Sequence, residues 1–152
     1  MARAFPDPDV TAALAPFARV AVDFAAARPV ADRLAANWTP TLCFLDPDGR
    51  ERHRLVGWHP APELAAQARL ALGKIRFGQG RWAEAEALLA DVTAQHPARD
   101  AAPEAQYWIG AARYQRERKP DGIRAAWQEL VFRWPGSPWA IRANSPKPPP
   151  VA

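Results

Sequence analysis

The side chains that could perform chemistry in this chain are few and dispersed. Cys43 is the only cysteine among 152 residues, and it stands inside the apolar run of residues 41–45. A single thiol can form neither an intramolecular disulfide nor a two-cysteine redox motif, and a buried free cysteine behaves as a small hydrophobic residue. We therefore expect Cys43 to pack in the core, and it is the one redox candidate of the chain.

No other set of polar residues predicts a catalytic or metal centre. His53, His59 and His96 fall on an expected strand, a loop and a helix end, without the ligand spacing of a metal site. The two serines, Ser137 and Ser145, lack the sharp turn of a nucleophile elbow. A glycine-rich phosphate loop is also absent from the sequence. The sequence thus predicts no metal, no cofactor and no hydrolase-type site.

The composition argues against nucleic-acid and membrane partners. The net charge is only +4, and the basic residues are interleaved with acids, which is typical of a solvated helix surface. Arg outnumbers Lys seventeen to three, a bias that indicates a GC-rich, bacterial-type genome rather than a nucleic-acid interface. Apolar runs stay well below the about 18 residues of a membrane span, and the first residues lack a signal-peptide core. We expect a cytoplasmic protein.

The N-terminal part has the pattern of alternating helices and strands. Asp7 followed by Pro8 is a helix start, and the turn Asp46-Pro47-Asp48-Gly49 joins two strand-like runs. The second run is the more polar of the two, which places it nearer a sheet edge. In chain order we expect a helix over 8–15, a strand over 17–24, a helix over 29–37, a buried strand over 41–45 and an antiparallel strand over 50–57.

This order of elements, with Trp38-Thr39-Pro40-Thr41 before the apolar run, resembles the thioredoxin-like fold over about residues 5–72. The resemblance implies a cis peptide bond before Pro40. It also implies a Cys-x-x-Cys segment and a central strand, and neither is in this chain, so the likeness is to an N-terminally truncated unit. Three outcomes stay open: a true start upstream, which we favour, collapse of the remaining strands, or an oligomer in which another chain pairs with the unpaired strand.

The C-terminal part has the periodicity of four helices, over 63–79, 82–95, 103–118 and 121–134. They form two pairs that align on each other at an offset of 37–38 residues. Gly73 then matches Gly110, Leu89 matches Trp127 and Pro97 matches Pro135. Helix pairs with a small residue at this place resemble tetratricopeptide repeats.

The repeat resemblance implies a peptide-binding inner face on the first helix of each pair. The residues that it places there are Lys74, Phe77, Tyr107 and Tyr114, together with Leu70 and Ala111. Lysine and aromatic side chains in such a place can grip a peptide. The alternative is that the rings pack against the αβ unit, at a junction where we also expect Trp38 and Trp58.

The expected fold class is therefore α/β plus all-α. The thioredoxin-like unit covers residues 1–62, two tetratricopeptide-like helix pairs cover 63–143 with helix 63–79 shared, and a proline-rich, disordered tail covers 144–152. The expected function is that of a non-catalytic protein-interaction module with a protein or peptide partner. The alternative is a thioredoxin-family thiol-disulfide oxidoreductase whose active-site segment lies upstream. Because this chain lacks Cys-x-x-Cys, we favour the non-enzyme.

Overall fold

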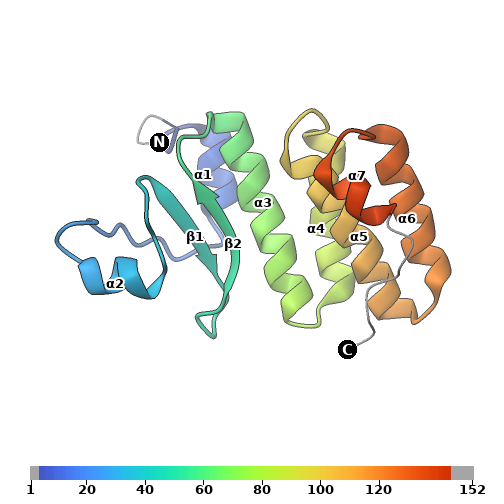
Figure 1. The fold of residues 1–152 in the computed structure, drawn as a ribbon, viewed down its shortest axis with the longest axis horizontal. Coiled ribbons are helices and arrows are strands. Elements are labelled where there is room, and N and C mark those ends of the chain that lie inside the picture. Colours follow the sequence, from blue (N-terminus) through green and yellow to red (C-terminus); the bar gives the residue numbers. More distant parts are fainter. Residues whose placement is uncertain (1–3, 145–152) are drawn as a thin grey trace.

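A computed structural model describes residues 4–144, which form seven helices and one two-stranded sheet. Figure 1 shows a small αβ region beside a larger helical region, with helix α3 between them. The described chain is thus a mixed α/β and helical protein, as expected. Its elements are α1 (Pro8–Leu14), α2 (Arg28–Arg33), β1 (Thr41–Leu45), β2 (Glu51–Val56), α3 (Ala61–Gly78), α4 (Trp82–Gln95), α5 (Ala101–Glu117), α6 (Pro120–Arg133) and α7 (Pro138–Ala143).

The β1–β2 hairpin is held at its turn by one carboxylate. The backbone N–H groups of Asp48 and Arg50 donate to Asp46 Oδ1 at 3.0 and 2.9 Å, and the Arg52 guanidinium donates to Oδ2 at 2.8 Å. Gly49 takes φ +77°, the left-handed conformation that the sequence predicts for this turn. The strands pair antiparallel, with Leu42 opposite Leu55 and Phe44 opposite His53.

Two expectations for the αβ region are wrong. The expected strand over 17–24 does not form: residues 18–23 have no regular secondary structure, and Val20 is 83% exposed. A strand needs a neighbour for its backbone groups, and the sheet of the described residues contains only β1 and β2. The strand over 41–45 is not covered on both faces either, since only Phe44 is buried and Leu45 is exposed.

The α2 helix is also shorter than expected, Arg28–Arg33 in place of 29–37. Ala35 takes φ +47°, which a helix cannot contain. The Arg54 side chain donates to the backbone carbonyls of Leu34 and Ala35 and so joins the end of α2 to β2.

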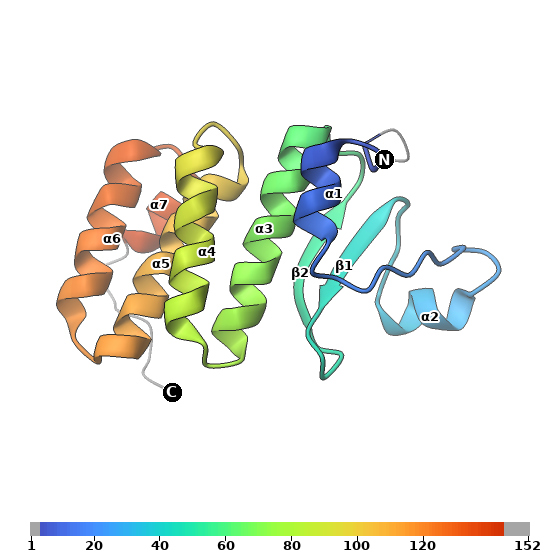
Figure 2. The ribbon, with the colours of Figure 1, turned by 180° about the vertical axis from the view of Figure 1, so that it is seen from behind.

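Helix α3 belongs to two hydrophobic cores at once. On one side Leu64 packs with Phe44 and Leu55 of the hairpin and with Val10 of α1. On another side Leu70 packs in a second core. The α3 residues of the first core are Leu64, Ala65, Ala68 and Ala71, and the second core contains Ala66, Leu70, Ala85, Leu89, Val92, Ala101, Ala105, Ile109 and Ala126. The view from behind in Figure 2 shows α1 and α4 against α3 from its two sides.

The two helix pairs, α3–α4 and α5–α6, repeat one close contact. A Cβ atom on Gly73 would lie 2.7 Å from Leu89 Cδ2, and one on Gly110 would lie 2.8 Å from Trp127 Cδ1. The four residues of these two contacts are ones that the offset of 37–38 residues matches in the sequence. Helix α7, which we did not expect as a separate element, follows with Ser137 as its N-cap.

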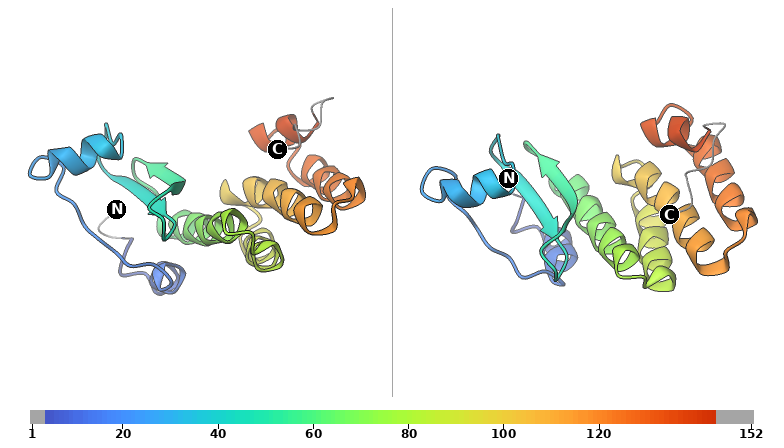
Figure 3. Two further views of the ribbon diagram at one scale, coloured as in Figure 1. Left: turned by 90° about the horizontal axis from the view of Figure 1, so that it is seen from below. Right: turned by 60° about the horizontal axis from the view of Figure 1, so that its bottom comes forward.

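Helices α3 and α5 form a layer, and one side of this layer is flanked by β2 and by α7. The left panel of Figure 3 shows β2 and α7 on one side of the layer that contains α3 and α5, and α1 and α4 on the other. Helix α7 contacts α5 as well as α6, and β2 contacts α3. The expected disordered tail lies, apart from Asn144, outside the described residues.

Candidate interaction face

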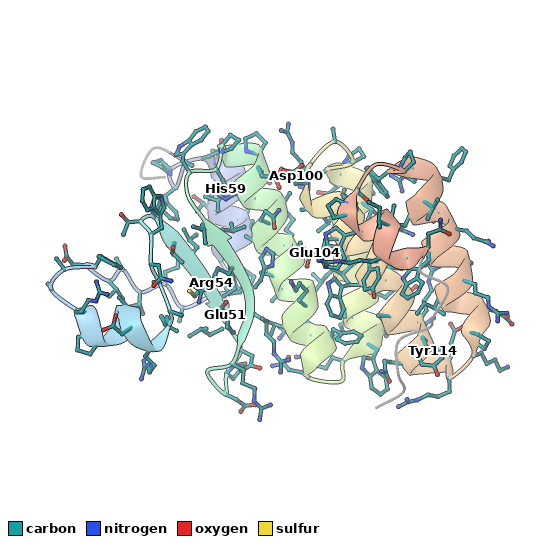
Figure 4. All side chains as sticks on the ribbon, in the orientation of Figure 1. Glu51, Arg54, His59, Asp100, Glu104 and Tyr114 are labelled. Carbon is teal, nitrogen blue, oxygen red and sulfur yellow. The ribbon has the colours of Figure 1, made fainter. Side chains whose placement is uncertain are left out.

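Seven partly exposed side chains form a connected surface between β2 and α7, which we call the α3–α5 face. Figure 4 labels one of them, Glu104, where α5 lies next to α3. Each member contacts another through a hydrogen bond, an ion pair or ring packing, as set out below. The members are His53, Lys74, Phe77, Glu104, Tyr107, Trp108 and Trp139.

The polar half of the α3–α5 face centres on Lys74. Its ammonium group donates to Glu104 Oε1 at 2.7 Å and lies 3.0 Å from His53 Nδ1. Trp108 Nε1 donates to the same Glu104 oxygen at 3.2 Å, and Lys74 Nζ lies 5.8 Å from the centre of a Trp108 ring. The Lys74 and Glu104 side chains are only 16% and 12% exposed, which limits the screening of this ion pair by water.

The aromatic half runs from α3 across α5 to α7. Phe77 packs edge-on against Trp108 with ring centres 5.0 Å apart. Tyr107 stacks on Trp127 of α6, with ring centres 4.9 Å apart. It also packs at an angle against Trp139 of α7, with ring centres 5.2 Å apart. Each of these rings therefore packs against at least one other ring.

A second polar chain leads inward from His53. The buried Gln67 side chain accepts a hydrogen bond at Oε1 from His53 Nε2, with a distance of 2.6 Å. Its own Nε2 donates a hydrogen bond to Glu63 Oε1 at 2.8 Å. Glu63 Oε2 in turn accepts the backbone N–H of Asp100 at 3.2 Å. The chain joins β2 to α3 and to the start of α5, so the hairpin and the helix pairs share one hydrogen-bond network.

The structure brings together three of the four residues expected for peptide binding. Lys74, Phe77 and Tyr107 belong to the α3–α5 face. Tyr114 lies in the C-terminal part of α5, apart from Glu104 (Figure 4), and its ring packs against none of the other described aromatic rings. Leu70 was expected on this face, but it is fully buried in the core that α3 shares with α4, α5 and α6.

Sequence reasoning missed the partners of these residues. Glu104 and Trp108 stand one turn apart on α5 and could have been found from that spacing. Trp139 lies on α7, and no pattern in the sequence predicts that this helix returns to α5. His53 was considered only as a metal ligand, and nothing in the sequence predicts its contact with Lys74 at the edge of the α3–α5 face.

The residues of the thioredoxin-like resemblance lie elsewhere. Cys43 is half-buried on β1, opposite Arg54. Burial raises the pKa of its thiol, Arg54 opposes this and Glu51 adds to it. The Thr39–Pro40 peptide bond is cis. Trp38 and Trp58, expected at the junction of the two halves, are exposed instead.

Two other functions, metal binding and membrane crossing, find no support in residues 4–144. In that range no three His, Cys, Asp or Glu side chains are grouped so that they could hold a metal ion. In the same range no helix has the length and apolar character that crossing a membrane requires.

No protein-family model matches the chain, and neither does any curated protein or solved structure. The two resemblances read from the sequence therefore stay predictions.

Proposed function

We propose that this protein is a non-catalytic interaction module, a thioredoxin-like remnant joined to two tetratricopeptide-like helix pairs. In this proposal the α3–α5 face binds an extended segment of a partner protein. The observation that carries it is the continuous, partly exposed array from Lys74 and Glu104 through Trp108 and Tyr107 to Trp139.

The repeat-like architecture is supported by the helix packing. The small residues Gly73 and Gly110 admit Leu89 and Trp127 at the same place in the two pairs. Because the pairs repeat, their first helices α3 and α5 lie next to each other and contact one another. A segment that crosses α3, α5 and α7 would then meet successive side chains of one surface.

The residue types suit a protein partner. Tyrosine, tryptophan and arginine dominate the energetically important positions of protein interfaces, since they bury large areas and keep a polar group for orientation. Tyr107, Trp108 and Trp139 supply such area, and the Arg142 guanidinium lies 4.4 Å above a Trp139 ring. Their mutual packing reduces the entropy that binding would cost.

Thiol chemistry is a poor candidate for this chain on its own. A redox-active cysteine needs a lowered pKa, because the thiolate is the nucleophile. The pKa of Cys43 is shifted the other way by burial, and the sequence offers no second thiol.

The test is a selection of peptides from a random displayed library against the folded chain, followed by affinity measurement on variants. Tyr107→Ala and Trp139→Ala should each weaken the selected peptides by about tenfold or more, the range of interface hot spots. The matched control is Phe132→Ala on α6, which removes a ring that is 87% exposed and outside the α3–α5 face. Circular dichroism checks that each variant is folded.

Two outcomes would contradict the proposal. One is that no peptide is selected above the background of an unrelated protein. The other is that Phe132→Ala weakens binding as much as the two face variants, because binding would then not depend on this surface.

A further inference from the structure

His53 occupies a position where only one protonation state satisfies its neighbours. Gln67 uses its amide N–H to reach Glu63, so its Oε1 faces His53 and requires a proton on Nε2. The Lys74 ammonium has donors only, so it requires a lone pair on His53 Nδ1, 3.0 Å away. The neutral imidazole with its proton on Nε2 meets both demands.

The groups around His53 come from four elements. Helix α3 supplies Lys74 and Gln67, α5 supplies Glu104, β2 itself supplies Glu51, and β1 places the Phe44 ring 5.9 Å from the imidazole. Glu104 bonds directly to Lys74 rather than to His53. A positive charge on His53 would therefore meet an ammonium group at contact distance, without a carboxylate of its own.

We propose that His53 is a pH-sensitive latch, which holds the β1–β2 hairpin on α3 while neutral and releases it when protonated. The proton would replace the lone pair that Lys74 uses and turn an attractive contact into a repulsive one. The latch acts on the hairpin because His53 is the residue of β2 that enters the polar chain to Lys74 and Glu104.

The direction of the pH effect follows from the electrostatics. Burial lowers the pKa of His53 below its ordinary value, and Lys74 lowers it further, against smaller opposing effects of Glu104, Gln67 and Glu51. The unfolded chain then binds a proton more readily than the folded one. The stabilisation is complete above the unfolded pKa of about 6.5 and is lost as the pH falls below it towards the folded pKa.

A second histidine could produce a similar trend and has to be separated. The pKa of His96 is lowered as well, by burial and then by Arg69. His96 is the C-cap of α4, and its charged neighbours are Arg69, Asp9, Arg99 and Glu63 rather than Lys74. Its effect would not be confined to the hairpin.

The experiment is hydrogen exchange of the hairpin amides at about pH 7.5 and about pH 5.5, corrected for intrinsic exchange. In the unaltered chain, protection of the β1–β2 amides should fall about threefold or more relative to the α4 and α5 amides. His53→Gln can donate to Gln67 and accept from Lys74 without titrating, so it should abolish the fall. His96→Gln should retain it.

Constant hairpin protection in the unaltered chain would overturn the latch, and so would an equal fall in His53→Gln. Because that variant could also perturb the hairpin, the His53 Cε1–H resonance of the unaltered chain is titrated by NMR. A midpoint below about 6.5 is expected, and a midpoint at or above it would overturn the proposal independently. Neither measurement involves a peptide, so the latch is tested separately from the proposed function.

Discussion

The two sides of α3 differ in how completely they are packed. In the helical region Leu70, Leu89 and Leu130 are fully buried, and among the described residues only Phe132 and Ile141 are large apolar side chains that remain exposed. In the αβ region large apolar side chains remain on the surface. Those side chains are Val20, Val22, Trp38, Leu45, Val56 and Trp58.

The contrast comes from backbone hydrogen bonding rather than from composition. A helix satisfies most of its backbone groups internally, so a helix pair needs only side-chain partners. A strand needs the backbone of a neighbour, and in residues 4–144 β1 has only β2. Val20 and Val22 are β-branched residues of the kind that strands favour. Because their segment has no paired neighbour, both side chains stay exposed.

The largest expected effect comes from two leucines on the same helix that face different cores. Leu70→Ala and Leu64→Ala remove equal volumes from fully buried sites, so each should cost about 2–5 kcal/mol. Leu70→Ala should lower protection throughout the helix pairs. Leu64→Ala should act chiefly on α1 and the hairpin, which it contacts. Urea unfolding gives the free energies, and hydrogen exchange locates the loss.

The same two variants can also contradict the difference between the two sides of α3. If Leu64→Ala lowers protection of α4 and α6 as much as protection of the hairpin, the two cores unfold as one unit. The difference in packing would then have no counterpart in local stability.

A medium effect is expected at the repeated glycine contact. Gly73→Ala gains up to about 1 kcal/mol of helix propensity but places a Cβ 2.7 Å from Leu89 Cδ2 and Cγ in a filled core, a strain of about 1–3 kcal/mol. We expect net destabilisation in thermal unfolding, with Gly110→Ala behaving alike against Trp127.

The control for the glycine prediction lies on the same helix. The three atoms nearest to a Cβ at Gly78 belong to the partly exposed Arg52 guanidinium. A shift of this group would loosen its bond to Asp46 Oδ2 but would leave the two backbone bonds to Asp46 Oδ1. Gly78→Ala should stay within about 0.5 kcal/mol of the unaltered chain. If Gly73→Ala stabilised the protein as much as Gly78→Ala, the helix pairs would be more loosely packed than their burial indicates.

Much of the fold could be predicted from local chemistry. The turn residues Asp46 to Gly49 specify the hairpin, and Asp7 with Pro8 specifies the start of α1. The matched glycines and their large partners indicate the repeat. The strand over 17–24 could not be excluded from sequence, because its formation depends on a neighbour rather than on its own residues.

The candidate site was less accessible to sequence reasoning. The repeat resemblance implies Lys74, Phe77 and Tyr107, whereas Tyr114, which it places on the same face, lies apart from the cluster. The contact of His53 with Lys74 joins residues 21 positions apart on a strand and a helix. Such contacts depend on how the hairpin docks on α3, and no local pattern encodes that.

The smallest expected effect concerns a reaction rate, that of Cys43 with an aromatic disulfide reagent. Burial raises the pKa of the thiol and restricts access, only partly opposed by Arg54, so labelling at about pH 7.5 should be slower in the folded chain than in urea. An exposed control from the same region is Trp58→Cys in a Cys43→Ala background, since Trp58 is 65% exposed. That thiol should react quickly.

The ratio of the two labelling rates refines the comparison between the regions. Slow labelling of Cys43 beside fast labelling of the Trp58→Cys thiol would mean that the hairpin face carrying Cys43 and Arg54, which bonds to the end of α2, is closed. Loose packing in the αβ region would then be confined to the side chains that are exposed in the structure. Equal rates would mean that this face opens readily as well, and the difference from the helix pairs would be larger than the static burial indicates.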